Sequence, residues 1–104
     1  MGEVKSEIAM RSDNFIAIRD IQPKAEGHML VIPKQHYTTL LDIPNKIGNE
    51  LLEFMKKVAA SLLSEKYGTG FNVVTNNFSV AGQVVMHAHL HIIPRKDGDG
   101  LRMM

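Results

Sequence analysis

Three histidines alternate with apolar residues near the end of the chain. His87, His89 and His91 are separated by single apolar residues within the run from Met86 to Arg95. Because successive side chains of a β-strand point to opposite faces, an extended run would place all three imidazoles on one face. Imidazole can attack as a nucleophile, donate hydrogen bonds or carry a proton near pH 7. The run therefore indicates nucleophilic phosphoryl-group chemistry, without showing which ring attacks.

Metal binding and plain structural packing are the two other interpretations of this run. At about 3.3 Å per residue, His87 and His91 leave an extended backbone roughly 13 Å apart, so only an adjacent pair could share one ion. The chain has no cysteine, and the nearest carboxylates, Asp97 and Asp99, follow the predicted strand. A histidine-rich strand that satisfies its own hydrogen bonds fits the residue types equally well. We expect neither a metal nor another cofactor.

A polar loop that contains a glycine precedes the histidines. Asn76, Ser79 and Gln83 offer neutral hydrogen-bonding groups, and Gly82 can take a positive φ and let a ligand approach the backbone closely. Many turns have this composition, so the loop alone is weak evidence. Beside three imidazoles on one face, it predicts a phosphate-binding site.

Two separate segments resemble the histidine triad (HIT) family. The run from Ala81, A-G-Q-V-V-M-H-A-H-L-H-I-I-P-R, is similar to the family signature, in which Gly-Gln precedes three histidines that alternate with apolar residues. The segment from Asp20 to His36 is similar to a second family block, D-I-x-P-x-A-x-G-H-x-L-V-I-P-K-x-H. The resemblance extends from about Gly2 to Gly98 and points to the Hint-like or the bacterial and archaeal branch.

The resemblance implies roles for the matching residues. His89 would be the nucleophile, forming a covalent nucleotidyl-histidine at the α-phosphate that water then cleaves. His91 would contact the phosphate, while His87, together with His28, would set the hydrogen bonding behind the nucleophile. The implied substrate contacts are Asp20 for the ribose hydroxyls, Val4, Ile18, Ile21 and Leu30 for the base, and Asn76, Gly82 and Val84 for the phosphates, beside Gln83 from the loop.

Several of these residues have alternative interpretations. Asp20 could be a turn residue and His28 a structural hydrogen bonder, and we expect Lys34 and His36 on the surface. Many relatives carry a hydroxyl where this chain has Val84, which offers only its backbone N–H. The family also has a short helix, often with a C-x-x-C-like metal motif, before the point where this chain begins, so we expect some base contacts to be missing or replaced.

The implied function is that of a nucleotide hydrolase. Its substrate would be a purine nucleoside phosphoramidate or a dinucleoside polyphosphate, attacked at the α-phosphate. The related nucleotidyltransferase branch replaces the third histidine with glutamine, whereas this chain keeps His91, which favours hydrolysis. The alternative is a nucleotide-binding interaction protein with weak, incidental hydrolase activity. We expect a nucleotide and a second copy of the chain as partners, and neither nucleic acid nor a membrane.

The composition fits one domain, which we expect to span residues 1–104, and the extent of the family resemblance implies a core at 2–98 followed by a tail at 99–104. The chain has 104 residues, of which 44% are hydrophobic, and a net charge of +1. The charges are interspersed, which disfavours a surface dedicated to polyanions. The sequence shows neither an apolar run near 18 residues nor a signal-peptide pattern, and we expect a cytoplasmic location.

Turn signals and hydrophobic periodicity predict the order strand, strand, strand, helix, strand, strand. The predicted strands lie at 8–10, 15–18, 29–32, 71–75 and 84–93. Asp42 would cap the helix with Pro44 in its first turn, and Gly68 would stop it. The helix would bury Leu51, Met55, Val58, Ala59, Leu62 and Leu63. The predicted class is α+β, an antiparallel sheet of five to six strands with one long helix on one face. The family resemblance implies that this sheet continues across a homodimer.

Overall fold

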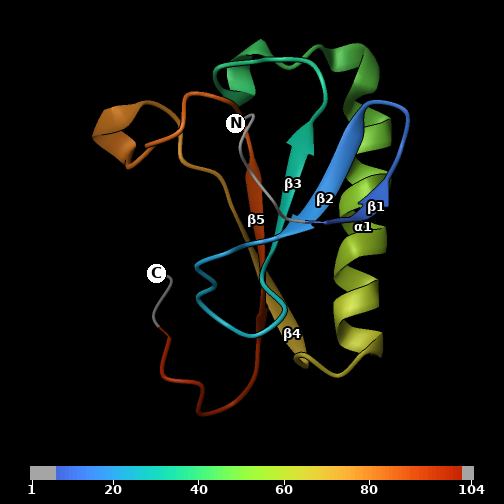
Figure 1. Cartoon of the computed structure of the whole chain (residues 1–104), viewed down its shortest axis with the longest axis vertical. Helices are drawn as coiled ribbons and strands as arrows, with labels where there is room; N and C mark the ends of the chain where they lie inside the picture. The colour runs from blue at the N-terminus through green and yellow to red at the C-terminus, as the bar shows by residue number, and fades with distance from the viewer. Residues whose placement is uncertain (1–6, 102–104) are drawn as a thin grey trace.

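The computed structural model describes residues 7–101, which form a five-stranded antiparallel sheet and one long α-helix (Figure 1). The strands are β1 (Ile8–Arg11), β2 (Phe15–Arg19), β3 (Met29–Pro33), β4 (Gly70–Val74) and β5 (Leu90–Arg95). The helix α1 (Gly48–Ser64) connects β3 to β4. The strand order in the sheet is β1-β2-β3-β5-β4. The predicted fold class is confirmed, with five strands.

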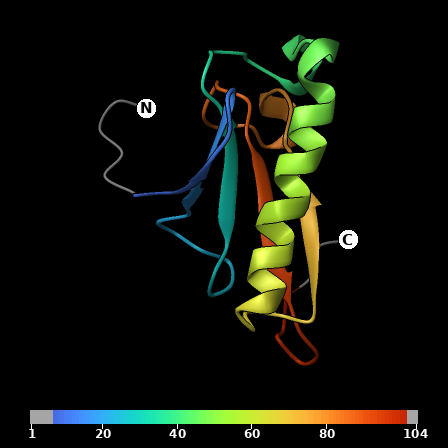
Figure 2. The same cartoon turned by 90° about the vertical axis from the view of Figure 1, so that its right-hand side faces the viewer.

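The hydrophobic core lies between α1 and one face of the sheet (Figure 2). The buried residues of α1 are Leu51, Phe54, Val58, Ala59 and Leu62. They pack against alternate residues of the central strands, namely Phe15, Ala17, Met29, Val31, Leu90 and Ile92. The predicted helix face is correct apart from Phe54, which was missed, and Met55 and Leu63, which are only partly buried. Among residues 7–101, no helix combines the length and apolarity needed to cross a bilayer.

The predicted start of the helix was wrong. Asp42 instead stabilises a short 3₁₀ turn, η1 (Leu40–Asp42), because its carboxylate accepts the Thr39 N–H at 3.1 Å. Pro44 is extended, with φ −65° and ψ 140°, and precedes a second 3₁₀ turn, η2 (Asn45–Ile47). The local hydrogen bonding of Asp42 and the extended backbone at Pro44 delay α1 until Gly48.

Gly68 has a different role from the predicted helix stop. The chain leaves α1 at Ser64, and Lys66 rather than a glycine takes the left-handed conformation, with φ +66°. A Cβ atom on Gly68 would lie only 2.7 Å from the carbonyl oxygen of Arg95. Glycine is therefore needed at position 68 because two backbone segments approach closely where β4 begins beside the end of β5.

The predicted histidine strand was wrong at its beginning. Residues 84–89 lie outside the sheet, and β5 starts only at Leu90. The connection between β3 and α1 holds this segment instead, because the Ala88 N–H donates to the Tyr37 carbonyl at 2.6 Å. The predicted strand end was also wrong, since β5 continues through Pro94. Pairing with β3 ends at Ile92, so Pro94 lies where β5 pairs with β4 alone.

The segment after β5 is anchored to the sheet. The Arg95 guanidinium donates to the Asp99 carboxylate through Nε at 2.7 Å and Nη2 at 3.0 Å. Its Nη1 donates to Asn72 Oδ1 at 2.6 Å, on the neighbouring strand β4. The hydrogen bond from Arg95 is the main cause that lowers the pKa of Asp99 well below its usual range. Asp99, placed in a tail by the sequence analysis, therefore ties this segment to β5.

Candidate active site

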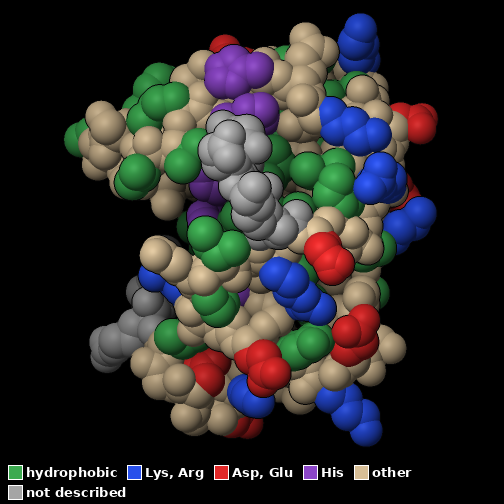
Figure 3. Space-filling model, viewed as in Figure 1, with side chains coloured by type: hydrophobic (Ala, Val, Ile, Leu, Met, Phe, Trp, Pro, Cys, Tyr) green, Lys and Arg blue, Asp and Glu red, His purple; other side chains and the backbone are tan. Residues whose placement is uncertain are grey.

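The histidines gather on the face of the sheet that α1 does not cover. Leu30 pairs with Ile18 on β2 and with His91 on β5, so these three residues form one cross-strand row on this face. The loops that follow β2 and β4 flank this row. Histidine side chains are visible over the upper half of this face, some of them within a hollow (Figure 3).

His89 has a hydrogen-bond partner that fixes its tautomer. Its Nδ1 lies 2.8 Å from the backbone carbonyl oxygen of His87. Because a carbonyl can only accept a hydrogen bond, Nδ1 carries the proton and Nε2 keeps its lone pair. The Thr75 hydroxyl donates to the His89 carbonyl at 2.9 Å and holds the backbone. The ring lines a cavity together with Leu30, Ile32, Val85 and His87.

His28 and His91 form a hydrogen-bonded pair of neutral imidazoles. His28 Nε2 lies 3.0 Å from His91 Nδ1. The Lys24 backbone N–H donates to His28 Nδ1 at 3.1 Å, so the proton of His28 must be on Nε2. His28 therefore donates to His91, and the proton of His91 is on its other nitrogen, Nε2. His28 is only 1% exposed, whereas the His91 side chain is 19% exposed, so the pair extends from the interior to the open face of the sheet.

Asp20 completes a triangle with this pair. Its Oδ2 lies 3.5 Å from His28 Nε2 and 4.0 Å from His91 Nδ1. Its Oδ1 accepts the backbone N–H of Gln22 at 2.9 Å, as expected of a turn residue. Asp20 therefore combines the turn geometry with a position beside the two imidazoles.

The surroundings keep the His28–His91 pair neutral in the free protein. Burial, followed by the charges of His28 and His89, lowers the pKa of His91 from 6.5 to about 4, although Asp20 acts in the opposite direction. Burial is also the largest cause that lowers the pKa of His28. At pH 7 both rings are therefore uncharged and can act as hydrogen-bond relays.

The same three side chains have the spacing of a metal site. Ligand atoms of Asp20, His28 and His91 all lie within 4.8 Å of one another. A metal ligand needs a free lone pair, but His28 Nε2 carries the proton because Nδ1 accepts the Lys24 N–H. These hydrogen bonds therefore favour a network of protonated and accepting nitrogens around Asp20 over a metal site.

A second histidine pair lies on the other side of His89. His36 Nδ1 is 3.1 Å from His87 Nδ1, and His87 Nε2 is 3.0 Å from the Pro33 carbonyl oxygen. The carbonyl requires a proton on His87 Nε2, so His36 donates through Nδ1. His36 is exposed, as expected, but its contact with His87 was not predicted. His28, expected to act with His87, contacts His91 instead.

The polar loop has a well-defined shape around Gly82. Gly82 takes φ +95° after the 3₁₀ turn η3 (Ser79–Ala81), and a Cβ there would lie 3.8 Å from Asn76 Cγ. The Gln83 side chain is 3% exposed, and its Oε1 accepts the Phe78 N–H at 2.7 Å. Its Nε2 donates to two carbonyl oxygens, those of Thr38 and Val85. Gln83 thus shapes the loop, while Asn76 and Gly82 lie side by side.

The remaining predicted contacts differ in exposure. Ile18 is buried on the site face, and Leu30 lines the cavity. Ile21 and Val84 are exposed, at 78% and 87%. Val4 lies outside the described residues. The structure therefore brings Ile18 and Leu30 to the histidines and leaves Ile21 and Val84 open to solvent.

The sequence analysis missed His36 and the backbone partners of the histidine rings, namely the Lys24 N–H and the carbonyls of Pro33 and His87. Backbone groups carry no signal in residue type. A signal for His36 existed, because His28 and His36 flank β3, which runs antiparallel to β5. This arrangement brings the His28 side chain to His91 and the His36 side chain to His87.

Comparisons with known proteins agree with this geometry. The family model described as the HIT domain matches residues 1–98. An uncharacterized HIT-like protein of Methanocaldococcus jannaschii is 42% identical, over 95% of this chain and 76% of that protein. An adenosine 5'-monophosphoramidase of Candida albicans is 39% identical, over 92% of this chain and 66% of that protein. An adenylylsulfatase of Arabidopsis thaliana is 37% identical, over 86% of this chain and 45% of that protein.

Solved structures give the same result. A histidine triad nucleotide-binding protein from Candida albicans superposes with a TM-score of 0.85 at 40% identity, over 99% of this chain and 76% of that chain. A HIT family protein from Bacillus anthracis gives a TM-score of 0.89 at 32% identity, over 99% of this chain and 74% of that chain. The chain belongs to the HIT family.

Proposed function

We propose that this protein hydrolyses a nucleoside 5'-phosphoramidate at the α-phosphate through a covalent nucleotidyl-His89 intermediate. The observation that carries the proposal is the hydrogen bond between His89 Nδ1 and the His87 carbonyl at 2.8 Å, which leaves Nε2 free to attack. The names of two relatives, an adenosine 5'-monophosphoramidase and an adenylylsulfatase, support an adenine nucleotide as substrate.

The reaction has two steps. In the first, His89 Nε2 forms a bond to phosphorus, and the bond to the leaving nitrogen breaks with its electron pair staying on that nitrogen. The leaving amine takes a proton from Nε2 of His91, which has gained a second proton and become an imidazolium in the substrate complex. In the second step, water attacks phosphorus, its proton returns to His91, and the electron pair of the P–N bond returns to His89. The products are a nucleoside monophosphate and an amine.

The charge pattern favours a phosphoramidate over a dinucleoside polyphosphate. The segment from Thr75 to Pro94, which carries the loop and the triad, contains no lysine, arginine, aspartate or glutamate. A polyphosphate leaving group carries several negative charges, which are usually matched by cations. We therefore expect dinucleoside polyphosphates to be the poorer substrates.

The substrate contacts follow the positions of the expected residues. Asp20 accepts the ribose hydroxyls, since its carboxylate lies beside the histidine pair. Ile18 and Leu30 offer an apolar surface to a purine base. Asn76, Gly82 and the Val84 N–H surround the phosphate, and Gln83 keeps the loop in shape.

The test is a panel of adenosine and guanosine phosphoramidates and dinucleoside polyphosphates, with and without Mg²⁺. We expect turnover of phosphoramidates with release of the nucleoside monophosphate. Saturable nucleotide binding without turnover across the panel would contradict hydrolysis and support the alternative of a nucleotide-binding interaction protein.

We also propose that the protein is a homodimer whose sheet continues through β4. This strand is an edge of the sheet, and Phe71 and Val73 on it are 43% and 46% exposed. Exposed apolar side chains on an unpaired edge favour association. Sedimentation at micromolar concentration should give a dimer, and Val73→Pro should weaken it. A monomeric, fully active wild type would contradict this proposal.

A further inference from the structure

We propose that Asp20 has a second role, which rests on the proposed function. In addition to binding ribose, Asp20 accepts a hydrogen bond when His91 becomes an imidazolium. The N–H groups of His28 and His91 would then point at each other, and one of them turns to the Asp20 carboxylate. This contact stabilises the imidazolium that protonates the leaving group. Asp20 is then a positioning residue for the acid.

The geometry of the pair allows only one proton between the two rings. His28 Nε2 and His91 Nδ1 are 3.0 Å apart, and the His28 proton already occupies this space. A second proton on His91 would direct two N–H groups at each other, so one of them needs another acceptor. Asp20 Oδ2 provides it, at 3.5 Å from one nitrogen and 4.0 Å from the other.

His28 cannot resolve this conflict by changing its tautomer. Its Nδ1 accepts a hydrogen bond from the backbone N–H of Lys24. If the His28 proton moved to Nδ1, two N–H groups would point at each other there as well. The displaced N–H therefore turns toward Asp20, whose side chain is only 17% exposed. At this low exposure, water competes weakly with the carboxylate for the N–H.

The charges around His91 point the same way. His28, His89 and Lys24 all disfavour a positive charge on His91. Asp20 is the one neighbouring group among the described residues that favours it. A bound α-phosphate adds a second negative charge, so the imidazolium forms in the substrate complex rather than in the free protein.

Both roles of Asp20 fit on one carboxylate. An ionised carboxylate has about four lone-pair sites, and the Gln22 N–H uses one of them. The ribose hydroxyls and the displaced N–H can share the remainder. Ribose binding should affect KM, whereas support of the acid should affect kcat, and only for leaving groups that need a proton.

The experiment compares two leaving groups in the full chain. Adenosine 5'-phosphoramidate releases an amine that must be protonated, whereas the p-nitrophenyl ester of AMP releases a stable phenolate. In Asp20→Asn, we expect kcat for the phosphoramidate to fall about 10- to 100-fold, which is within the range of general acid catalysis, and the ester to change less than about threefold. The loss should shrink as the pH is lowered, and it should be the same for the 2'-deoxy phosphoramidate.

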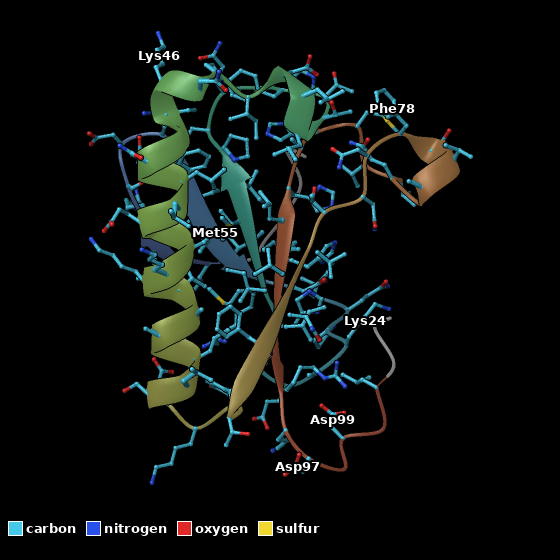
Figure 4. The ribbon with its side chains drawn as sticks, turned by 180° about the vertical axis from the view of Figure 1, so that it is seen from behind. Lys24, Lys46, Met55, Phe78, Asp97 and Asp99 are labelled. Carbon is cyan, nitrogen blue, oxygen red and sulfur yellow. The ribbon has the colours of Figure 1, made fainter. Side chains whose placement is uncertain are left out.

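A matched control is Asp97→Asn. This residue lies in the turn beyond β5, away from the loop that carries Lys24 (Figure 4), and the substitution removes the same charge. It should leave kcat for both substrates unchanged, and Asp20→Glu should restore part of the lost phosphoramidate activity. Unfolding curves of each variant report whether it folds.

The outcomes separate this inference from the proposed function. An equal loss of kcat for both leaving groups, or a change in KM alone, would overturn the role of Asp20 and leave hydrolysis intact. Absence of turnover in the wild type would overturn the proposed function itself. Should Asp20→Asn fail to fold, Asp20→Glu decides, because a carboxylate moved by one methylene should lower kcat for the phosphoramidate more than kcat for the ester, and an equal change in both would overturn the role.

Discussion

The two histidine pairs that flank His89 have nearly the same geometry and very different surroundings. The nitrogens are 3.0 Å apart in the His28–His91 pair and 3.1 Å apart in the His36–His87 pair. His28 is buried beside the carboxylate of Asp20, whereas His36 is exposed to solvent. Because burial and a nearby charge govern the proton affinity of imidazole, equal contacts do not imply equal chemistry.

The partners of each pair indicate how the tasks are divided. The His87 carbonyl receives the Nδ1–H of His89, and the His87 ring is fixed by the Pro33 carbonyl, so the exposed pair orients the ring that we propose as the nucleophile. His91 packs directly against His89, with ring centroids 5.1 Å apart. In the proposed reaction, the buried pair would transfer protons near the phosphorus atom, and the exposed pair would hold the backbone behind His89.

The largest effect is expected for His89→Ala, which removes the residue that both pairs serve. Turnover should fall about 10⁴-fold or more, as is typical when a nucleophile is deleted, while AMP binding remains measurable by calorimetry. Mass spectrometry after an acid-free quench should find a nucleotidyl adduct on His89 of the wild type. An adduct on His87 or His91 alone would show that another histidine is the nucleophile. The two pairs could then no longer be compared as groups that both support His89.

The comparison is tested directly by His91→Gln. This change removes the proton donor but keeps a hydrogen-bonding side chain of similar reach. We expect kcat for a phosphoramidate to fall about 10²- to 10⁴-fold, the range of general acid–base catalysis. A loss of similar size for a p-nitrophenyl ester of AMP would show that His91 binds phosphate and does not supply a proton.

The sequence was sufficient for the order of the strands and for most of the helix face, and it singled out four of the five histidines that the structure brings together, all except His36. Short continuous apolar runs identify β2 and β3, and the three- and four-residue spacing of the apolar residues between Leu51 and Leu62 identifies α1. The starts of α1 and β5 were missed because long-range or competing hydrogen bonds decide them, such as that between the Ala88 N–H and the Tyr37 carbonyl. Local periodicity contains no information about such partners.

The pairing of the histidines was missed for a related reason. It depends on the register of β3 against β5, in which Leu30 lies opposite His91. Only this register brings His28 and His36, at the two ends of β3, against different members of the triad. The tautomers depend further on backbone groups of Lys24, Pro33 and His87, whose positions follow from the fold rather than from residue type.

The buried pair should also make stability depend on pH. Burial lowers the pKa of His91 to about 4, whereas an unfolded histidine titrates near 6.5, so the unfolded chain binds more protons between these values. The free energy of unfolding should therefore fall as the pH drops from about 6.5 to 4, by up to about 1.4 kcal/mol per pH unit for one such group. Urea unfolding at several pH values measures this slope. His91→Gln should flatten it, and an unchanged slope would locate the titration elsewhere.

The smallest effect is expected for His36→Gln, the matched change in the exposed pair. Its ring lies in solvent and contacts His87, whose orientation is also held by the Pro33 carbonyl at 3.0 Å. Losing one exposed hydrogen bond costs about 0.5–1.5 kcal/mol at most, which corresponds to a reduction in kcat of about tenfold or less. A loss of kcat equal to that of His91→Gln would show that the exposed pair takes part in the chemistry, and burial would then no longer explain how the two pairs differ.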